Sequence, residues 1–111
     1  MTEKQTKAYL ADPISELISL VYFTDYKDIN DHLDCEIFTS AFRLECGDVL
    51  YVDDMGMFNG NEKGMFAIPE AYDKPLFGRG LLVGSTPDGD SKDPETDLLD
   101  FAMMVKWLEV I

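Results

Sequence analysis

One apolar run bounded by turn-forming residues constrains the fold of this chain more than any other stretch. Residues 49–52 are all β-branched, aliphatic or aromatic, which favours a strand in the middle of a sheet. The sequence Asp53-Asp54-Met55-Gly56 follows and is typical of a tight turn. Before the run, residues 37–44 place side chains alternately on two faces, as a strand does. A reversal at residues 45–48 then predicts that the two strands are antiparallel neighbours.

Upstream of this hairpin the chain predicts another pair of strands. Residues 7–11 form a short segment that we expect to be an edge strand. Asp12-Pro13 marks a turn, because the residue before proline avoids helical backbone. The apolar positions of residues 14–23 fit neither the helical nor the strand period cleanly. Because Val21-Tyr22-Phe23 favours a strand, residues 16–23 are expected to pair with the first segment.

Downstream of the hairpin the pattern predicts three short strands and a helix. The strands are expected at residues 57–58, 65–68 and 80–84. An acid and a proline then open a helix over residues 94–104. Residues 105–111 fit either a continued helix or a last strand, and we expect the strand.

Together these elements predict an α+β fold. We expect a mostly antiparallel sheet of five to seven strands with two helices packed on one face. A chain of 111 residues is long enough for one hydrophobic core and too short for two, so the prediction is a single domain over residues 1–111. The polar residues 1–6 are expected to fray.

The first predicted helix carries a regular row of acids. Thr24 or Asp25 is expected to cap it, and it runs to about Leu33 with Tyr26 and Ile29 in its buried stripe. Four acids recur every third residue on the opposite side and are the candidate partner-binding residues: Asp25, Asp28, Asp31 and Asp34. The helix dipole favours the first two acids only. The last two therefore suggest a face that recognises a partner.

The charge of the chain limits what that partner is. Twenty-two acids against nine Lys and Arg residues give a net charge of −13. Nucleic-acid phosphates need cations, so direct nucleic-acid binding is excluded, whereas imitation of nucleic acid is not. No apolar run has transmembrane length and the N-terminus lacks a signal-peptide core, which predicts a soluble, cytoplasmic protein with no membrane partner. Cys35 and Cys46 bracket a predicted strand, so both are expected to be free thiols.

No motif predicts catalysis, a metal or a cofactor. His32, Cys35 and Cys46 are too few to complete a structural zinc site. Asp53 and Asp54 are explained by their turn, although paired carboxylates also suit a hard cation or acid-base chemistry. The glycine-containing residues 80–86 lack the lysine of a phosphate-binding loop. We therefore expect a protein that is not an enzyme.

One basic residue offers an alternative site. Arg79 lies between Gly78 and Gly80, and flanking glycines would expose its guanidinium to an anionic ligand. The three residues are the candidate ligand-binding residues of a small-ligand or nucleotide-binding domain built on residues 77–84.

With these residues placed, the chain resembles a small family of phage and mobile-element proteins known as domain of unknown function 3846. The resemblance rests mainly on residues 26–29, 35–38, 47–56, 66–68 and 75–84. Its most specific elements are the spacing of Tyr-Val-Asp-Asp-x-Gly and Gly-x-Gly-Leu-x-Val-Gly, and it spans roughly residues 26–101. The resemblance implies an accessory protein made inside a bacterium, with no established activity.

The predicted function combines this resemblance with the charge. We expect a non-enzymatic acidic accessory protein of a phage or mobile element that binds a host protein in the bacterial cytoplasm. Its acidic faces would steer it toward a basic or nucleic-acid-binding partner. Inhibition of that partner by a nucleic-acid-like negative surface is one form of this hypothesis. The sequence leaves self-association open.

Overall fold

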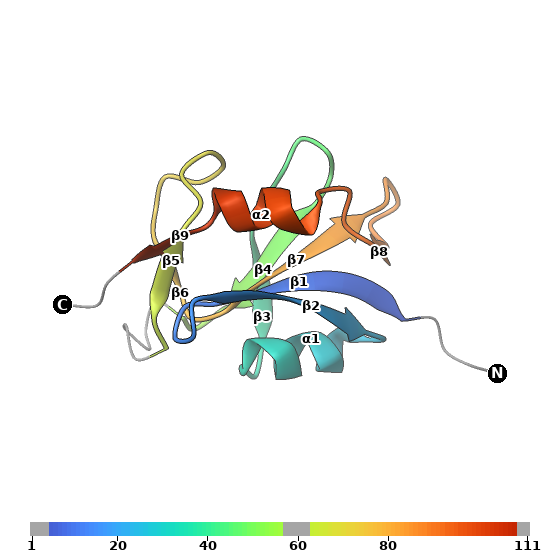
Figure 1. Cartoon of the computed structure of the whole chain (residues 1–111). Coiled ribbons are helices and arrows are strands. Elements are labelled where there is room, and N and C mark those ends of the chain that lie inside the picture. Colours follow the sequence, from blue (N-terminus) through green and yellow to red (C-terminus); the bar gives the residue numbers. More distant parts are fainter. Residues whose placement is uncertain (1–4, 57–62, 109–111) are drawn as a thin grey trace.

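The computed structural model describes residues 5–56 and 63–108, and within them the chain is an α+β protein (Figure 1). The described elements follow one another along the chain as β1 (Thr6–Asp12), β2 (Leu17–Phe23), α1 (Tyr26–Leu33), β3 (Phe38–Arg43), β4 (Val49–Asp53), β5 (Met65–Ala67), β6 (Leu76–Phe77), β7 (Gly80–Ser85), β8 (Ser91–Lys92), α2 (Leu98–Met104) and β9 (Lys106–Leu108). The predicted fold class is therefore confirmed. The predicted strand at residues 57–58 lies outside the described residues, as do residues 1–4 of the segment expected to fray.

The main sheet has six antiparallel strands. Its order is β2-β1-β7-β4-β3, and β8 pairs with the end of β7. The predicted hairpin is confirmed, because β3 and β4 are antiparallel partners and β4 lies inside the sheet between β3 and β7. The pairing of β2 with β1 is also confirmed. A smaller three-stranded sheet has the order β6-β5-β9, so residues 106–108 of the last segment form a strand as expected, while residues 109–111 lie outside the described residues.

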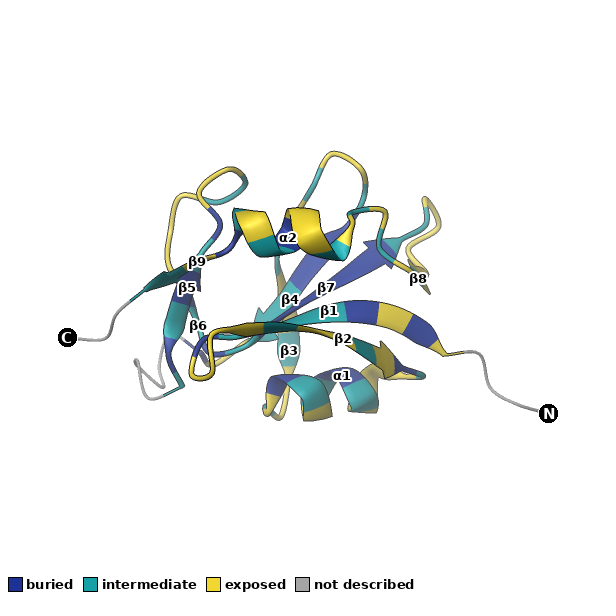
Figure 2. Ribbon diagram, viewed as in Figure 1, coloured by how far each residue is buried: buried dark blue, intermediate teal, exposed yellow. Residues whose placement is uncertain are grey.

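The prediction that both helices cover one face of the sheet is wrong. Helix α1 and helix α2 lie on opposite sides of it (Figure 1). Leu81 and Val83 of β7 share a core with the buried residues of α1, whereas Leu82 shares a core with Phe101 of α2. Neighbouring residues of a strand point to opposite faces, so a strand that is apolar at every position needs cover on both sides. Figure 2 shows β7 buried along its length, as this arrangement requires.

The place of β1 in the sheet and the start of α2 also differ from the sequence prediction. Strand β1 is an interior strand and not an edge strand, because β7 pairs along its other side. Helix α2 begins at Leu98 and not at residue 94. The buried carboxylate of Asp48 accepts hydrogen bonds from the backbone N–H groups of Glu95 and Thr96, both at 2.9 Å. These bonds hold the segment before α2 against the β3–β4 turn.

Helix α1 follows its predicted pattern except at one position. Asp25 is the N-cap, and its carboxylate accepts hydrogen bonds from the backbone of Lys27 and Asp28. Ile29 and Leu33 are buried as expected. Tyr26 is 63% exposed, so its assignment to the buried stripe is wrong. The first residue of a helix has no preceding turn to pack beside it, and here the ring stays in solvent.

Candidate binding surface

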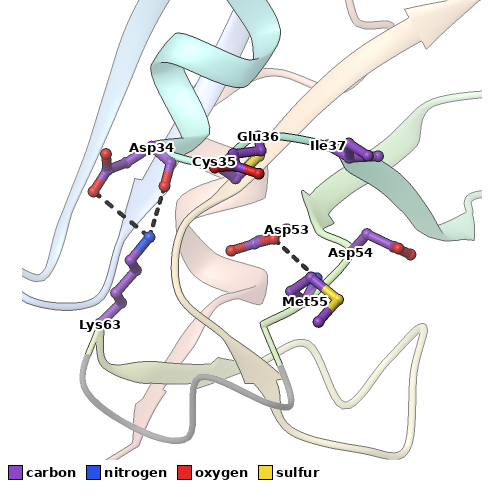
Figure 3. A pocket seen from close by; sticks show the side chains of 8 residues that line it. All are labelled: Asp34, Cys35, Glu36, Ile37, Asp53, Asp54, Met55 and Lys63. Carbon is purple, nitrogen blue, oxygen red and sulfur yellow. Dashed lines mark hydrogen bonds and ion pairs between the residues drawn. The ribbon is translucent and has the colours of Figure 1, made fainter.

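An open pocket of about 530 Å³ lies in the described part of the chain (Figure 3). It lies between the connection from α1 to β3, the turn after β4 and Lys63, which stands two residues before β5. Its lining residues are Asp34, Cys35, Glu36, Ile37, Asp53, Asp54, Met55 and Lys63. We refer to this group of eight residues as the acidic pocket, because four of them are carboxylates and only one is a cation.

Hydrogen bonds explain why two separate segments meet at the acidic pocket. Asp34 ends α1 in the left-handed conformation, with a φ of 55°, which turns the chain away from the helix. The backbone N–H of Asp54 then donates to the carbonyl of Ile37 at 3.0 Å. The carboxylate of Asp53 accepts from the backbone N–H of Met55 at 2.9 Å and so fixes the turn. The two acidic segments are therefore held side by side by backbone bonds.

Lys63 neutralises one corner of the acidic pocket. Its Nζ atom donates to the carbonyl oxygen of Asp34 at 2.6 Å and lies 3.7 Å from the carboxylate of the same residue (Figure 3). Both side chains are partly exposed, so this ion pair contributes little to stability. Glu36 and Asp54 are both exposed, and Asp54 lies across the pocket from this pair (Figure 3). They are the acids best placed to meet an incoming cation.

The thiol of Cys35 is unsuited to nucleophilic chemistry. The pKa of this thiol is raised to about 11, chiefly by burial and also by the nearby carboxylates of Asp53 and Asp34, while Lys63 lowers it. The Sγ atom also donates to the side-chain oxygen of Asn30 at 3.6 Å. The thiolate, which is the reactive form, is therefore scarce at neutral pH. The prediction that both cysteines are free is confirmed.

Two large apolar side chains accompany the acids. Ile37 is 64% exposed and Met55 is 52% exposed, although both line the acidic pocket. Methionine is flexible enough to adapt to varied partners. The combination of carboxylates with exposed apolar groups is suited to a surface that carries both a cation and an apolar side chain.

The four acids predicted from helix α1 have different surroundings in the structure. The carboxylate of Asp25 caps the helix, and that of Asp28 accepts from the backbone N–H of Thr24 at 2.7 Å, so both have a structural role. Asp31 is exposed on the helix. Asp34 alone of the four lines the acidic pocket. Helix capping thus accounts for Asp25 and Asp28, whereas Asp34 belongs to the acidic pocket.

Sequence reasoning missed Glu36 as a site residue and explained Asp53 and Asp54 by their turn, with a paired-carboxylate site as the alternative. A signal was present in the predicted hairpin. The start of one antiparallel strand lies beside the end of its partner, and Phe38 is indeed paired with Asp53. Acids just before the first strand and just after the second therefore had to lie close together. Lys63 gave no such signal, because its position depends on the path of the intervening chain.

The alternative residues around Arg79 are held in the structure by specific contacts. The Nη1 atom of Arg79 donates to the carbonyl oxygen of His32 at 3.0 Å, and Nη2 lies 3.7 Å from the carboxylate of Asp12. A Cβ atom on Gly80 would lie 2.6 Å from Cζ of Phe66, so this glycine permits close packing. Gly78 has a φ of +79°, which a side chain would strain.

Arg79 also lines a smaller hollow of about 200 Å³ together with Asp12, Ile14, Asp34 and Lys63. Drug-sized ligands usually occupy pockets of about 300 Å³ or more. The hollow contains two cations and two acids, so its charges balance. It is not the strongly cationic site that an anionic ligand would require.

Within residues 5–56 and 63–108 no three His, Cys, Asp or Glu side chains form a group able to hold a metal ion. The helices described here are too short and too polar to cross a membrane. Comparison of the chain with models of protein families, with curated proteins and with solved structures gives no match.

Proposed function

We propose that this chain is a non-enzymatic accessory protein of a phage or mobile element that binds a basic surface of a host protein through its acidic pocket. The observation that supports the proposal is the acidic pocket itself, which combines four carboxylates with exposed Ile37 and Met55. The chemistry that fits it is a Lys or Arg side chain beside an apolar one. In this proposal the protein acts in the bacterial cytoplasm.

The overall charge supports a basic partner. At least 13 of the 22 acids cannot be matched one to one with a Lys or Arg residue. The resulting negative field attracts a basic protein over a distance and speeds encounter. The same field resembles that of nucleic acid, so a nucleic-acid-binding host protein is the favoured kind of partner. Binding of this kind weakens as salt screens the charges.

The test is affinity capture from a bacterial lysate with quantitative mass spectrometry. The informative variant combines Glu36→Gln with Asp54→Asn, because both residues are exposed and line the acidic pocket. The matched control combines Asp73→Asn with Asp88→Asn, which removes the same charge from exposed residues outside it. We expect the pocket variant to bind the captured protein about tenfold more weakly, which is 1.4 kcal/mol, while the control binds it as the wild type does.

Equal losses in the two variants would show that net charge alone is responsible and that the acidic pocket is not the site. Capture that does not weaken with salt would contradict a charge-based interface. A purified candidate partner then allows calorimetry on the same pair of variants, so that the affinity is measured directly.

The second candidate function is small-ligand binding at Arg79. The observation that favours it is that Lys63 and Arg79 line the same small hollow. Calorimetry with a panel of nucleotides tests it, comparing the wild type with Arg79→Ala. We expect no binding, because the carboxylates of Asp12 and Asp34 already face these two cations. Micromolar affinity that is lost in the variant would reverse the order of the two proposals.

A further inference from the structure

Strand β2 forms an uncharged outer edge of the main sheet. Its seven residues pair with β1 in one continuous register and, among the described strands, with no other. They include no charged residue, no proline and no glycine, although 28% of the chain is charged. Leu17, Leu20 and Tyr22 are large apolar residues that are 60%, 44% and 47% exposed. Proteins usually protect such edges with charges, prolines or bulges, so an unprotected one is a site for pairing.

The opposite edge of the sheet is protected in the usual way. Strand β3 pairs with β4 through a register shift between Ser40 and Phe42, which marks a bulge. Its last residue, Arg43, is exposed and charged. A bulge twists an edge and interrupts its row of hydrogen-bonding groups. The contrast shows that β2 is the edge at which a further strand can pair.

Two hydrogen bonds establish which backbone groups of β2 point outward. The N–H of Lys7 in β1 donates to the carboxylate of Asp93 and therefore points away from its opposite residue, Tyr22. The carbonyl of Tyr22 lies 2.8 Å from Nε2 of His32, so it too points away from β1. Backbone direction alternates along a strand. The N–H and C=O groups of Ile18 and Leu20 therefore also face outward.

His32 limits which of these groups can pair. Its ring nitrogen contacts the outward carbonyl oxygen of Tyr22, so this carbonyl is already engaged. Among the described residues, the outward groups of Ile18 and Leu20 have no hydrogen-bond partner. A strand that joins the sheet without displacing His32 must therefore centre on these two residues, with Ser19 between them.

We propose that the occupant of this edge is β2 of a second copy of the chain, paired antiparallel about a two-fold axis at Ser19. In this register Ile18 of each copy exchanges two hydrogen bonds with Leu20 of the other, which gives four bonds in all. Both sheets then continue as one. A two-fold interface requires a self-complementary surface, and an uncharged strand with a small residue at its centre provides one.

The side chains are compatible with this register. Leu17 of one copy lies opposite Val21 of the other, and Ile18 lies opposite Leu20, so each cross-strand pair is apolar. Glu16 lies opposite Tyr22. The two Glu16 residues are then six positions apart, or about 20 Å at 3.3 Å per residue. This distance exceeds the screening length of about 8 Å at physiological salt, so these two charges do not oppose pairing.

This inference is independent of the proposed function. The net charge of the chain gives the two interactions different salt dependences, so they can be distinguished by experiment. Each copy carries −13, so salt should tighten the pairing of two copies by screening their repulsion. Binding of a basic partner should weaken with salt instead. The two interactions therefore respond in opposite directions, and the failure of one leaves the other unaffected.

The first experiment is sedimentation equilibrium of the purified chain over a concentration series at low and high salt. We expect a monomer–dimer equilibrium that favours the dimer at high salt. Leu20→Lys places a charge on the edge and should abolish the dimer. Leu99→Lys is the matched control, since Leu99 is 76% exposed on α2, and it should leave the dimer intact. Circular dichroism establishes that both variants are folded.

The second experiment tests the register by cross-linking. In a background of Cys46→Ser, Ser19→Cys should form an intermolecular disulfide under mild oxidation, because paired Cα atoms at this position lie about 4.5 Å apart. Leu17→Cys is the control, since its two copies would be separated by about 13 Å. A monomer at millimolar concentration in high salt would overturn the proposal. A dimer that survives Leu20→Lys, or cross-links equally well at both positions, would overturn it as well.

Discussion

The guanidinium of Arg79 donates to the carbonyl oxygen of His32 in the last turn of α1, with Nη1 and the oxygen 3.0 Å apart. Lys63 makes an equivalent bond to the carbonyl of Asp34, the C-cap of α1, two residues further along the chain. Carbonyl groups at the end of a helix lack partners within it and carry partial negative charge. Two of the nine basic residues of the chain therefore satisfy the end of a single helix and join it to the segments before β5 and β7.

The first prediction concerns the stability provided by this arrangement. Arg79→Ala removes a charge-assisted hydrogen bond and an ion pair from a partly exposed side chain, so the free energy of unfolding should fall by about 1 kcal/mol. Lys74→Ala is the control, because Lys74 is exposed and such positions change stability by no more than about 0.5 kcal/mol. Urea denaturation followed by circular dichroism measures both. An unchanged unfolding midpoint for Arg79→Ala would mean that the contact is not structural.

A second prediction concerns the buried carboxylate of Asp48. It accepts two backbone N–H bonds from the segment before α2, and asparagine can accept only one of them. Asp48→Asn should therefore lower the free energy of unfolding by about 2 kcal/mol. Asp88→Asn, at an exposed position, supplies the comparison. If the two variants unfold at the same urea concentration, the proposed anchor for the start of α2 is wrong.

The third prediction concerns the contact between Gly80 and Phe66. A methyl group at Gly80 would lie 2.6 Å from the ring, so Gly80→Ala should destabilise the protein by about 1–3 kcal/mol. Phe66→Leu shortens the ring side chain and should destabilise on its own by loss of packing. The double variant should be more stable than the sum of the two losses predicts, because the clash is relieved. Strict additivity in a double-mutant cycle would contradict the contact.

The fourth prediction follows from the raised pKa of Cys35. With a pKa of about 11, only about one thiol in a thousand is ionised at pH 8, so alkylation in the folded Cys46→Ser variant should be slow and should accelerate up to about pH 11. Unfolded Cys ionises near pH 8.5. The folded state thus holds its proton to higher pH than the unfolded state, and stability should fall between about pH 8.5 and 11. Rapid alkylation at pH 8 in native buffer would contradict the burial of this thiol.

The longer strands of the main sheet (β1, β2, β3, β4 and β7) could be predicted from the sequence because their signals are local. The uninterrupted apolar residues 81–83 and the turn at residues 45–48 identified β7 and the β3–β4 hairpin without any information from distant segments. The same run of apolar residues requires packing on both faces of the sheet. The prediction that both helices lie on one face did not take this requirement into account. Strands β6 and β8 have two residues each and exist only through their partners, so no periodicity could reveal them.

The candidate site was predictable only in part. Asp34 was identified from the helix, and the pairing of β3 with β4 accounts for Asp53 and Asp54. The late start of α2 depends on Asp48, which lies 47 and 48 positions before the residues it binds. Long-range contacts of this kind leave no pattern in a single sequence. Here the contacts of Asp48 set the start of α2 at Leu98, although the local sequence favours an earlier start of the helix.

The central place of β7 has a consequence for how the chain folds. Among the described strands, β1 and β4 are joined through β7 alone, and Tyr9 meets its partner Leu82 after 73 further positions of the chain. During synthesis, the β1–β2 and β3–β4 hairpins therefore emerge from the ribosome as separate units. Two-stranded hairpins are marginally stable on their own. The main sheet is completed only when β7 arrives, so refolding should be dominated by distant pairings and proceed in milliseconds to seconds, more slowly than for a helical protein of this size.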